Sequence, residues 1–98
     1  MRIEVHTFKL PCSEKEQALK VLEEAAEVFA EFQEVEHELA MGRPHDQCLC
    51  DDLGYEIADC ITACCNLAER YEIDLKAMIK KVEKSNRERG RYERTNND

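Results

Sequence analysis

Residues 14–40 read EKEQALKVLEEAAEVFAEFQEVEHELA and contain neither Pro nor Gly. Ser13 precedes this run, with Glu16 three residues later, which is the pattern of a capping box at a helix start. Gly42 and Pro44 follow it and are typical of a helix end. The sequence therefore predicts one long helix from about Glu14 to Ala40. Its apolar residues recur at helical spacing and form one stripe: Val21, Leu22, Ala25, Val28, Phe29 and Phe32.

Two shorter helices are predicted after it, one from about Asp51 to Tyr71 and one from Leu75 to about Arg89. Asp51 and Asp52 suit the positive N-terminal end of the first of these. Asp74 is a plausible N-cap for the second, and Gly90 a plausible stop. The middle helix has an apolar face whose residues follow helical spacing: Leu53, Ile57, Cys60, Ile61, Cys64, Leu67 and Ala68. In the last helix we expect four buried residues: Leu75, Met78, Ile79 and Val82.

The remaining segments are short. Residues 1–10 alternate weakly between apolar and polar, so a short strand and an extended arm both remain open. Residues 42–50 are expected to form a loop, and residues 91–98 a polar, frayed tail. We therefore expect a single all-α domain over residues 1–98, with residues 1–12 as an extended arm. Three amphipathic helices leave a small core, so we expect an antiparallel helical bundle that oligomerisation completes.

Composition narrows the class of protein. Of the 98 residues, 43% are hydrophobic and 37% are charged, as in helices with one apolar stripe and a charged outer face. Only three Gly and two Pro are present, which argues against a turn-rich all-β fold. The net charge of −8 argues against binding to nucleic acid. We see no apolar run long enough for a membrane span and no signal-peptide core, so we expect a cytoplasmic protein.

Six cysteines occur in this short chain. Without a signal peptide, reduced thiols are favoured over disulfides. Cys60 and Cys64 lie one helical turn apart and are interpreted as small core residues. His45, Cys48 and Cys50 could bind zinc with a further ligand, but they lack paired Cys-x-x-Cys spacing, and whether this loop binds anything stays open.

The strongest functional pattern is two pairs of carboxylates, Glu24 with Glu27 and Glu56 with Asp59. Residues three apart project from the same side of a helix, so two such pairs on facing helices could surround Mg²⁺ or Mn²⁺. The alternative is that they are ordinary acids on a solvated helix face, beside the apolar stripe. Small neighbours such as Ala25 and Ala58 favour a site, since they let helices approach closely.

The segments Glu23-Glu-Ala-Ala-Glu27 and Glu56-Ile-Ala-Asp59 resemble the E-E-x-x-E … E-x-x-D signature of the MazG-like all-α nucleoside-triphosphate pyrophosphohydrolases. The resemblance covers about residues 14–92. It implies Mg²⁺, with Mn²⁺ as the alternative ion, bound by Glu24, Glu27, Glu56 and Asp59. It also implies that Glu23, together with Glu24, takes part in catalysis by orienting or deprotonating a water.

The resemblance extends to the last helix, where Lys81, Asn86 and Arg89 are implied to bind the nucleotide substrate. Helical spacing also predicts that Asn86 and Arg89 point inward, where an inter-helix hydrogen bond is the alternative to a nucleotide. The implied reaction converts an NTP or dNTP to the monophosphate and pyrophosphate, in a homodimer or homotetramer. Alternatives are a phosphoribosyl-ATP pyrophosphohydrolase and a non-catalytic helical interaction module. The sequence selects no base or sugar.

Overall fold

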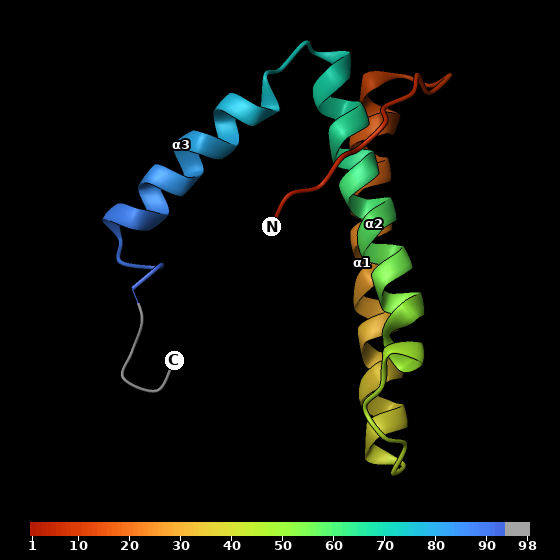
Figure 1. The fold of residues 1–98 in the computed structure, drawn as a ribbon. Helices are drawn as coiled ribbons and strands as arrows, with labels where there is room; N and C mark the ends of the chain where they lie inside the picture. The colour runs from red at the N-terminus through yellow and green to blue at the C-terminus, as the bar shows by residue number, and fades with distance from the viewer. Residues whose placement is uncertain (94–98) are drawn as a thin grey trace.

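The computed structural model describes residues 1–93 and contains three helices, with no strand among those residues. They are α1 (Glu14–Ala40), α2 (Gln47–Arg70) and α3 (Leu75–Glu88). The prediction of an all-α fold is thus confirmed. Helices α1 and α2 lie side by side as an antiparallel pair, while α3 leads away from them (Figure 1). Residues 94–98 of the predicted tail lie outside the described residues.

Each helix begins at a side chain that accepts a hydrogen bond from the first turn. Ser13 Oγ accepts from the Glu16 N–H at 3.1 Å, and Asp74 Oδ1 accepts from the Ala77 N–H at 3.0 Å, at the two predicted N-caps. The predicted start of the middle helix near Asp51 was wrong. Asp46 Oδ1 accepts from the Leu49 N–H at 2.8 Å, so α2 begins at Gln47 and the loop is shorter than expected.

All three helices end in the same hydrogen-bond pattern, the Schellman motif, in which the residue after the cap is left-handed. In α1 this residue is Gly42 (φ 92°), and in α3 it is Gly90 (φ 72°). In α2 it is Glu72 (φ 54°), whose N–H donates to the Glu69 carbonyl at 3.1 Å, while the Ile73 N–H donates to the Ala68 carbonyl at 3.0 Å. A side chain in this conformation is strained, because its Cβ crowds the backbone.

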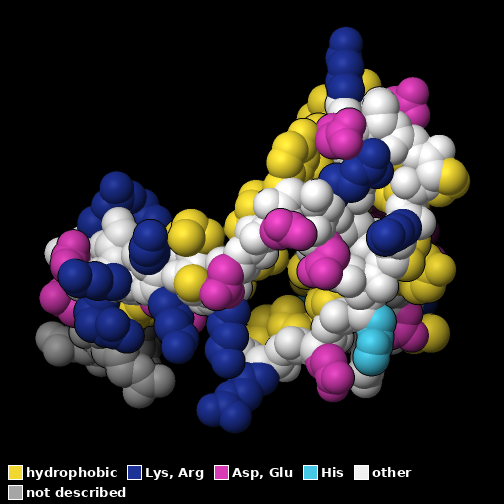
Figure 2. Space-filling view, turned by 90° about the horizontal axis from the view of Figure 1, so that it is seen from above, with side chains coloured by type: hydrophobic (Ala, Val, Ile, Leu, Met, Phe, Trp, Pro, Cys, Tyr) yellow, Lys and Arg dark blue, Asp and Glu magenta, His cyan; other side chains and the backbone are white. Residues whose placement is uncertain are grey.

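The core is the seam between α1 and α2, and it is small. Its buried residues are Gln17, Glu24 and Val35 from α1, with Leu49, Ala63, Asn66 and Ala68 from α2. The predicted apolar stripe of α1 lies largely outside this seam, since Leu22 is 66% exposed and Phe29 is 59% exposed. Within one chain the residues of α3 that were expected to be buried are not buried, and Val82 is 57% exposed. Hydrophobic side chains accordingly lie at the surface over the helix pair and α3 (Figure 2).

The six cysteines do not all lie where the sequence predicts. All six are free thiols in the structure, and Cys60 is half-buried, but Cys64 is exposed rather than a core residue. Burial raises the pKa of the Cys60 thiol, and the neighbouring Cys64 raises it further. Cys48 and Cys50 belong to the first turn of α2, not to a loop. Cys50 Sγ lies 3.8 Å from His45 Nε2, and no third metal ligand joins this pair among the described residues.

Residues 1–12 contain neither helix nor strand and form an extended arm that crosses the helix pair (Figure 1). The Phe8 N–H donates to Asn66 Oδ1 at 2.9 Å. Arg70 fastens the other end of the arm, because its guanidinium donates to the Cys12 carbonyl at 2.9 Å and to Gln17 Oε1 at 3.2 Å. Two side chains of α2 therefore hold the arm against the end of the helix pair. Within residues 1–93, no helix has the length and apolar character that a bilayer crossing requires.

Candidate metal centre

A row of mainly polar side chains, with Ala63 as its one apolar member, follows one face of each helix in the pair. On α1 the row is Gln17, Lys20, Glu24 and Glu27, and on α2 it is Glu56, Asp59, Ala63 and Asn66. The steps of three, four and three residues keep each row on one side of its helix. Because the helices are antiparallel, the carboxylates meet at one end of the two rows, within the seam, and the two amides lie at the other end of the rows.

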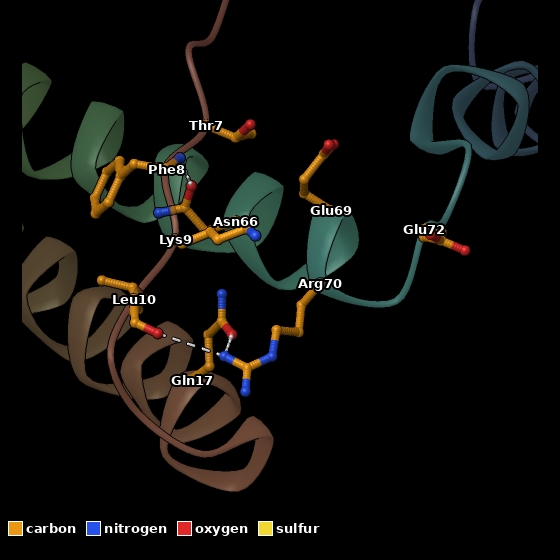
Figure 3. A pocket seen from close by; sticks show the side chains of 9 residues that line it. All are labelled: Thr7, Phe8, Lys9, Leu10, Gln17, Asn66, Glu69, Arg70 and Glu72. Atoms are coloured by element: carbon orange, nitrogen blue, oxygen red, sulfur yellow. Dashed lines mark hydrogen bonds between the residues drawn. The ribbon is translucent and has the colours of Figure 1, made fainter.

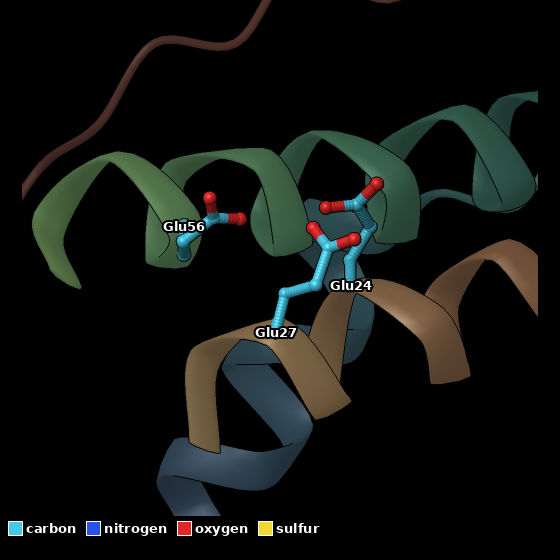
Figure 4. Close-up of side chains that lie close together, drawn as sticks. All are labelled: Glu24, Glu27 and Glu56. Carbon is cyan, nitrogen blue, oxygen red and sulfur yellow. The ribbon is translucent and has the colours of Figure 1, made fainter. Parts of the chain in front are cut away.

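Three carboxylates come together where the rows meet. One oxygen from each of Glu24, Glu27 and Glu56 lies within 4.8 Å of the others (Figure 4). Glu24 is buried, Glu56 is half-buried and Glu27 is exposed. The structure thus brings together three of the four carboxylates predicted as metal ligands, from two different helices.

Two oxygens of this cluster lack a partner. Glu24 Oε2 and Glu56 Oε2 are buried and accept no hydrogen bond from the described residues. The other oxygen of Glu24 lies 3.3 Å from Lys20 Nζ, so Lys20 compensates only part of the negative charge. A buried, unpartnered carboxylate oxygen is costly, because it has lost its water without gaining a donor. A cation placed among the three carboxylates would remove that cost.

The electrostatics of the cluster follow from this crowding. Burial raises the pKa of Glu56, and the adjacent negative charge of Glu27 raises it further. Asp59 and Glu24 act in the same direction. The hydrogen bond with Glu24 raises the pKa of Lys20, so that this side chain holds its proton more firmly. The cluster is therefore electronegative and short of positive charge.

The other predicted site residues lie outside the cluster of Glu24, Glu27 and Glu56. Asp59 lies one turn along α2 from Glu56 and lines a hollow of about 180 Å³ together with Glu24, but it does not join the set within 4.8 Å. Glu23 is largely exposed and lies 4.0 Å from Lys20 Nζ.

The three α3 residues are not brought to the carboxylates within one chain, because α3 leads away (Figure 1). Lys81 and Arg89 are exposed. Asn86 is half-buried, but its partners are its own neighbours, since Arg91 donates to Asn86 Oδ1 at 2.9 Å and Asn86 Nδ2 donates to the Tyr92 hydroxyl at 3.3 Å. Within one chain Arg89 does not point into a core, because α3 does not pack against the helix pair.

Sequence reasoning missed Gln17 and Asn66, which are 1% and 3% exposed. Both lie on the same helix faces as the carboxylates, ten residues from Glu27 and Glu56 respectively. Extending each carboxylate row along its helix by further steps of three and four residues would have found them.

The donor set fits a hard divalent cation. Carboxylate oxygens are the ligands that Mg²⁺ and Mn²⁺ prefer, and Mg²⁺ is commonly held by a few carboxylates with waters and substrate phosphates completing its shell. The cluster contains no thiol or imidazole that would favour a softer ion. No family model matches the chain, and no curated protein or solved structure matches it.

Proposed function

We propose that the protein is a Mg²⁺-dependent nucleoside-triphosphate pyrophosphohydrolase that converts an NTP or dNTP to the monophosphate and pyrophosphate. The observation that carries the proposal is the meeting of Glu24, Glu27 and Glu56 with two buried oxygens left without partners. The choice of reaction is supported by the resemblance of the two acidic segments to the MazG-like signature. A nucleotide pool as substrate implies a cytoplasmic protein.

The proposal assigns a role to each acidic residue of the two motifs and to Lys20. Glu24, Glu27 and Glu56 would hold Mg²⁺, or Mn²⁺ in its place, with Asp59 reaching it from the adjoining hollow. When bound, the cation would supply charge that neutralises phosphate oxygens and would make a water a better nucleophile. Glu23 is exposed beside the cluster, where a carboxylate can orient that water or accept its proton. Lys20 can place positive charge next to a phosphate without leaving Glu24.

We include a homodimer or homotetramer in the proposal. Phe29, Phe32 and Ile57 remain at least two-fifths exposed on the helix pair, and Met78, Ile79 and Val82 on α3. Packing these two apolar surfaces together across copies would bury them, as a helical bundle requires. The same packing could bring Lys81, Asn86 and Arg89 of one copy toward the carboxylates of another.

The test is turnover of all common NTPs and dNTPs, with product monophosphate and pyrophosphate separated by chromatography, with Mg²⁺ and with EDTA. The proposal expects activity in the wild type with Mg²⁺ and a loss of at least about a hundredfold in Glu56→Gln, since removing a metal ligand costs at least as much as removing an outer-shell partner. Glu36→Gln, which changes an exposed acid of the same helix as Glu24, is the matched control and should retain activity. A folded wild type that turns over no nucleotide would refute the proposal. Turnover of phosphoribosyl-ATP alone would replace it with the alternative substrate.

A further inference from the structure

Two neighbouring hollows lie between the carboxylates and the arm. The hollow of about 180 Å³ that Glu24 and Asp59 line also includes Phe8, Leu10 and Asn66. Those last three residues are shared with a larger hollow of about 840 Å³ that reaches Gln17 and Arg70. A volume of this size is within the range of small-molecule sites, roughly 300–1,000 Å³. We call these two neighbouring hollows together the arm hollow.

Two buried amides in the arm hollow have their orientation fixed. Asn66 Oδ1 accepts the Phe8 N–H, and Gln17 Oε1 accepts from the Arg70 guanidinium (Figure 3). The oxygen of each amide is therefore engaged, and its NH₂ group is the free end. Within residues 1–93, neither NH₂ group donates to a protein acceptor. Neither NH₂ nitrogen is among the fully buried atoms that lack a partner, so both remain open to donate to a ligand that brings acceptor atoms into the hollow.

The amides lie at a fixed distance from the carboxylates. Gln17 precedes Glu24 by seven residues on α1, and Asn66 follows Asp59 by seven on α2. Seven residues correspond to about 10 Å along a helix, and both intervals run in the same direction in space because the helices are antiparallel. A nucleoside with its first phosphate spans a comparable length. The donors thus lie where the nucleoside would be if the phosphates were at the carboxylates.

The wall of the arm hollow suits a flat ring. The Phe8 side chain is 57% exposed, and its ring lies on the side of Asn66 away from Arg70 (Figure 3). Leu10 extends the apolar wall along the arm. An exposed aromatic ring next to buried hydrogen-bond donors can stack a base while the donors engage its acceptor atoms.

We propose that the arm hollow binds the nucleoside moiety of the substrate, with the NH₂ groups of Gln17 and Asn66 donating to acceptor atoms of its base or sugar and with Phe8 contacting the ring. This inference rests on the proposed function, since the phosphates are assigned to the carboxylate end. It gives the arm a function in substrate binding in addition to its packing against the helices.

The test measures binding without turnover. Titration calorimetry with Mg²⁺ compares α,β-imido nucleoside triphosphates with inorganic tripolyphosphate, which lacks the nucleoside. Asn66→Asp and Gln17→Glu keep the acceptor oxygens for Phe8 and Arg70, remove the NH₂ donors and add one negative charge each. Each should raise the dissociation constant of the nucleotide about tenfold, the effect of one lost hydrogen bond to a buried group. Tripolyphosphate controls for the added negative charge, because through-space repulsion would weaken it at least as strongly.

Phe8→Ala changes an exposed side chain, so the test does not rely on substitutions at buried positions alone. It should weaken the nucleotide about tenfold through lost stacking and leave tripolyphosphate unchanged. Nucleotide affinities equal to wild type in all three variants would overturn the inference and leave the proposed function intact. Equal weakening of nucleotide and tripolyphosphate would also overturn it. A wild type that binds neither Mn²⁺ nor tripolyphosphate would overturn the proposed function, and this inference with it.

Discussion

Replacing Glu27 with Gln should stabilise the metal-free protein and reduce the stabilisation that a divalent cation provides. Glu27 is the exposed member of the cluster, and no Lys or Arg of residues 1–93 pairs with it. Its oxygen lies within 4.8 Å of that of Glu24. At that separation two negative charges in water repel by about 0.9 kcal/mol. Because Glu27 is exposed, this solvent-screened value is the appropriate one. The variant should therefore melt at a higher temperature than the wild type in EDTA.

The cation should reverse this order. At a hundred times its dissociation constant, Mn²⁺ or Mg²⁺ would stabilise the wild type by about 2.7 kcal/mol. That corresponds to a rise in melting temperature of about 11–22 °C in a domain of this size. If the lost ligand weakens binding about a hundredfold, the variant at the same cation concentration gains only about 0.4 kcal/mol. The wild type should then be the more stable protein by about 1.4 kcal/mol.

The assay is thermal unfolding followed by helical circular dichroism, in EDTA and across a cation titration at constant ionic strength. Glu36→Gln removes an exposed acid of α1 outside the cluster and should respond to the cation as the wild type does. A wild-type melting temperature that Mn²⁺ and Mg²⁺ leave unchanged would refute the reasoning. So would a Glu27→Gln variant that cannot be distinguished from Glu36→Gln.

Three further measurements test other parts of the structure. In EDTA, the raised pKa of Glu56 means that the folded protein binds the proton of this carboxyl group more tightly than the unfolded chain does. The free energy of unfolding should therefore fall as pH rises from the ordinary pKa of 4.5 through the raised pKa. Glu56→Gln should flatten that fall, and an unchanged pH profile would contradict the assigned cause. Asp46→Ala should cost about 1 kcal/mol through loss of the α2 cap, whereas Asp46→Asn should cost little, as chemical denaturation can show. Arg70→Lys should speed proteolytic cleavage within residues 1–12, which mass spectrometry can detect. The reason is that one ammonium group cannot replace the forked guanidinium that donates to the Cys12 carbonyl and to Gln17. Cleavage at the wild-type rate would show that other contacts hold the arm.

The local signals in the sequence predicted much of this fold. Helix boundaries could be predicted where they depend on hydrogen bonds within a single turn, as at the caps Ser13 and Asp74 and at the stop Gly42. Both predicted boundaries of α1 are confirmed. The start of α2 was missed because Asp51 and Asp52 indicate a helix start in the sequence. The helix begins at Gln47, four residues before Asp51, where Asp46 caps it and Leu49 is buried in the seam.

Burial was harder to predict than helicity. A stripe that includes Leu22 and Phe29 shows that α1 has an apolar face, but not whether α2 of the same chain covers it. The pair instead joins along the row that contains Glu24, with small residues such as Ala63 opposite it. The convergence of Glu24, Glu27 and Glu56 could be predicted from spacing, whereas the distance of α3 from them could not, since it depends on the connection after α2.

That connection has a mechanical consequence. Glu72 holds a left-handed backbone conformation at the end of α2 where the other two helices use glycine. A side chain there narrows the accessible backbone angles, while glycine would widen them. Helix α3 is 14 residues long and so extends about 21 Å beyond this point, and a rotation of about 10° at its base would move its far end by about 4 Å. The turn at Glu72 is therefore the pivot of α3, and its narrow range of backbone angles limits how far the last turn of α3 can move.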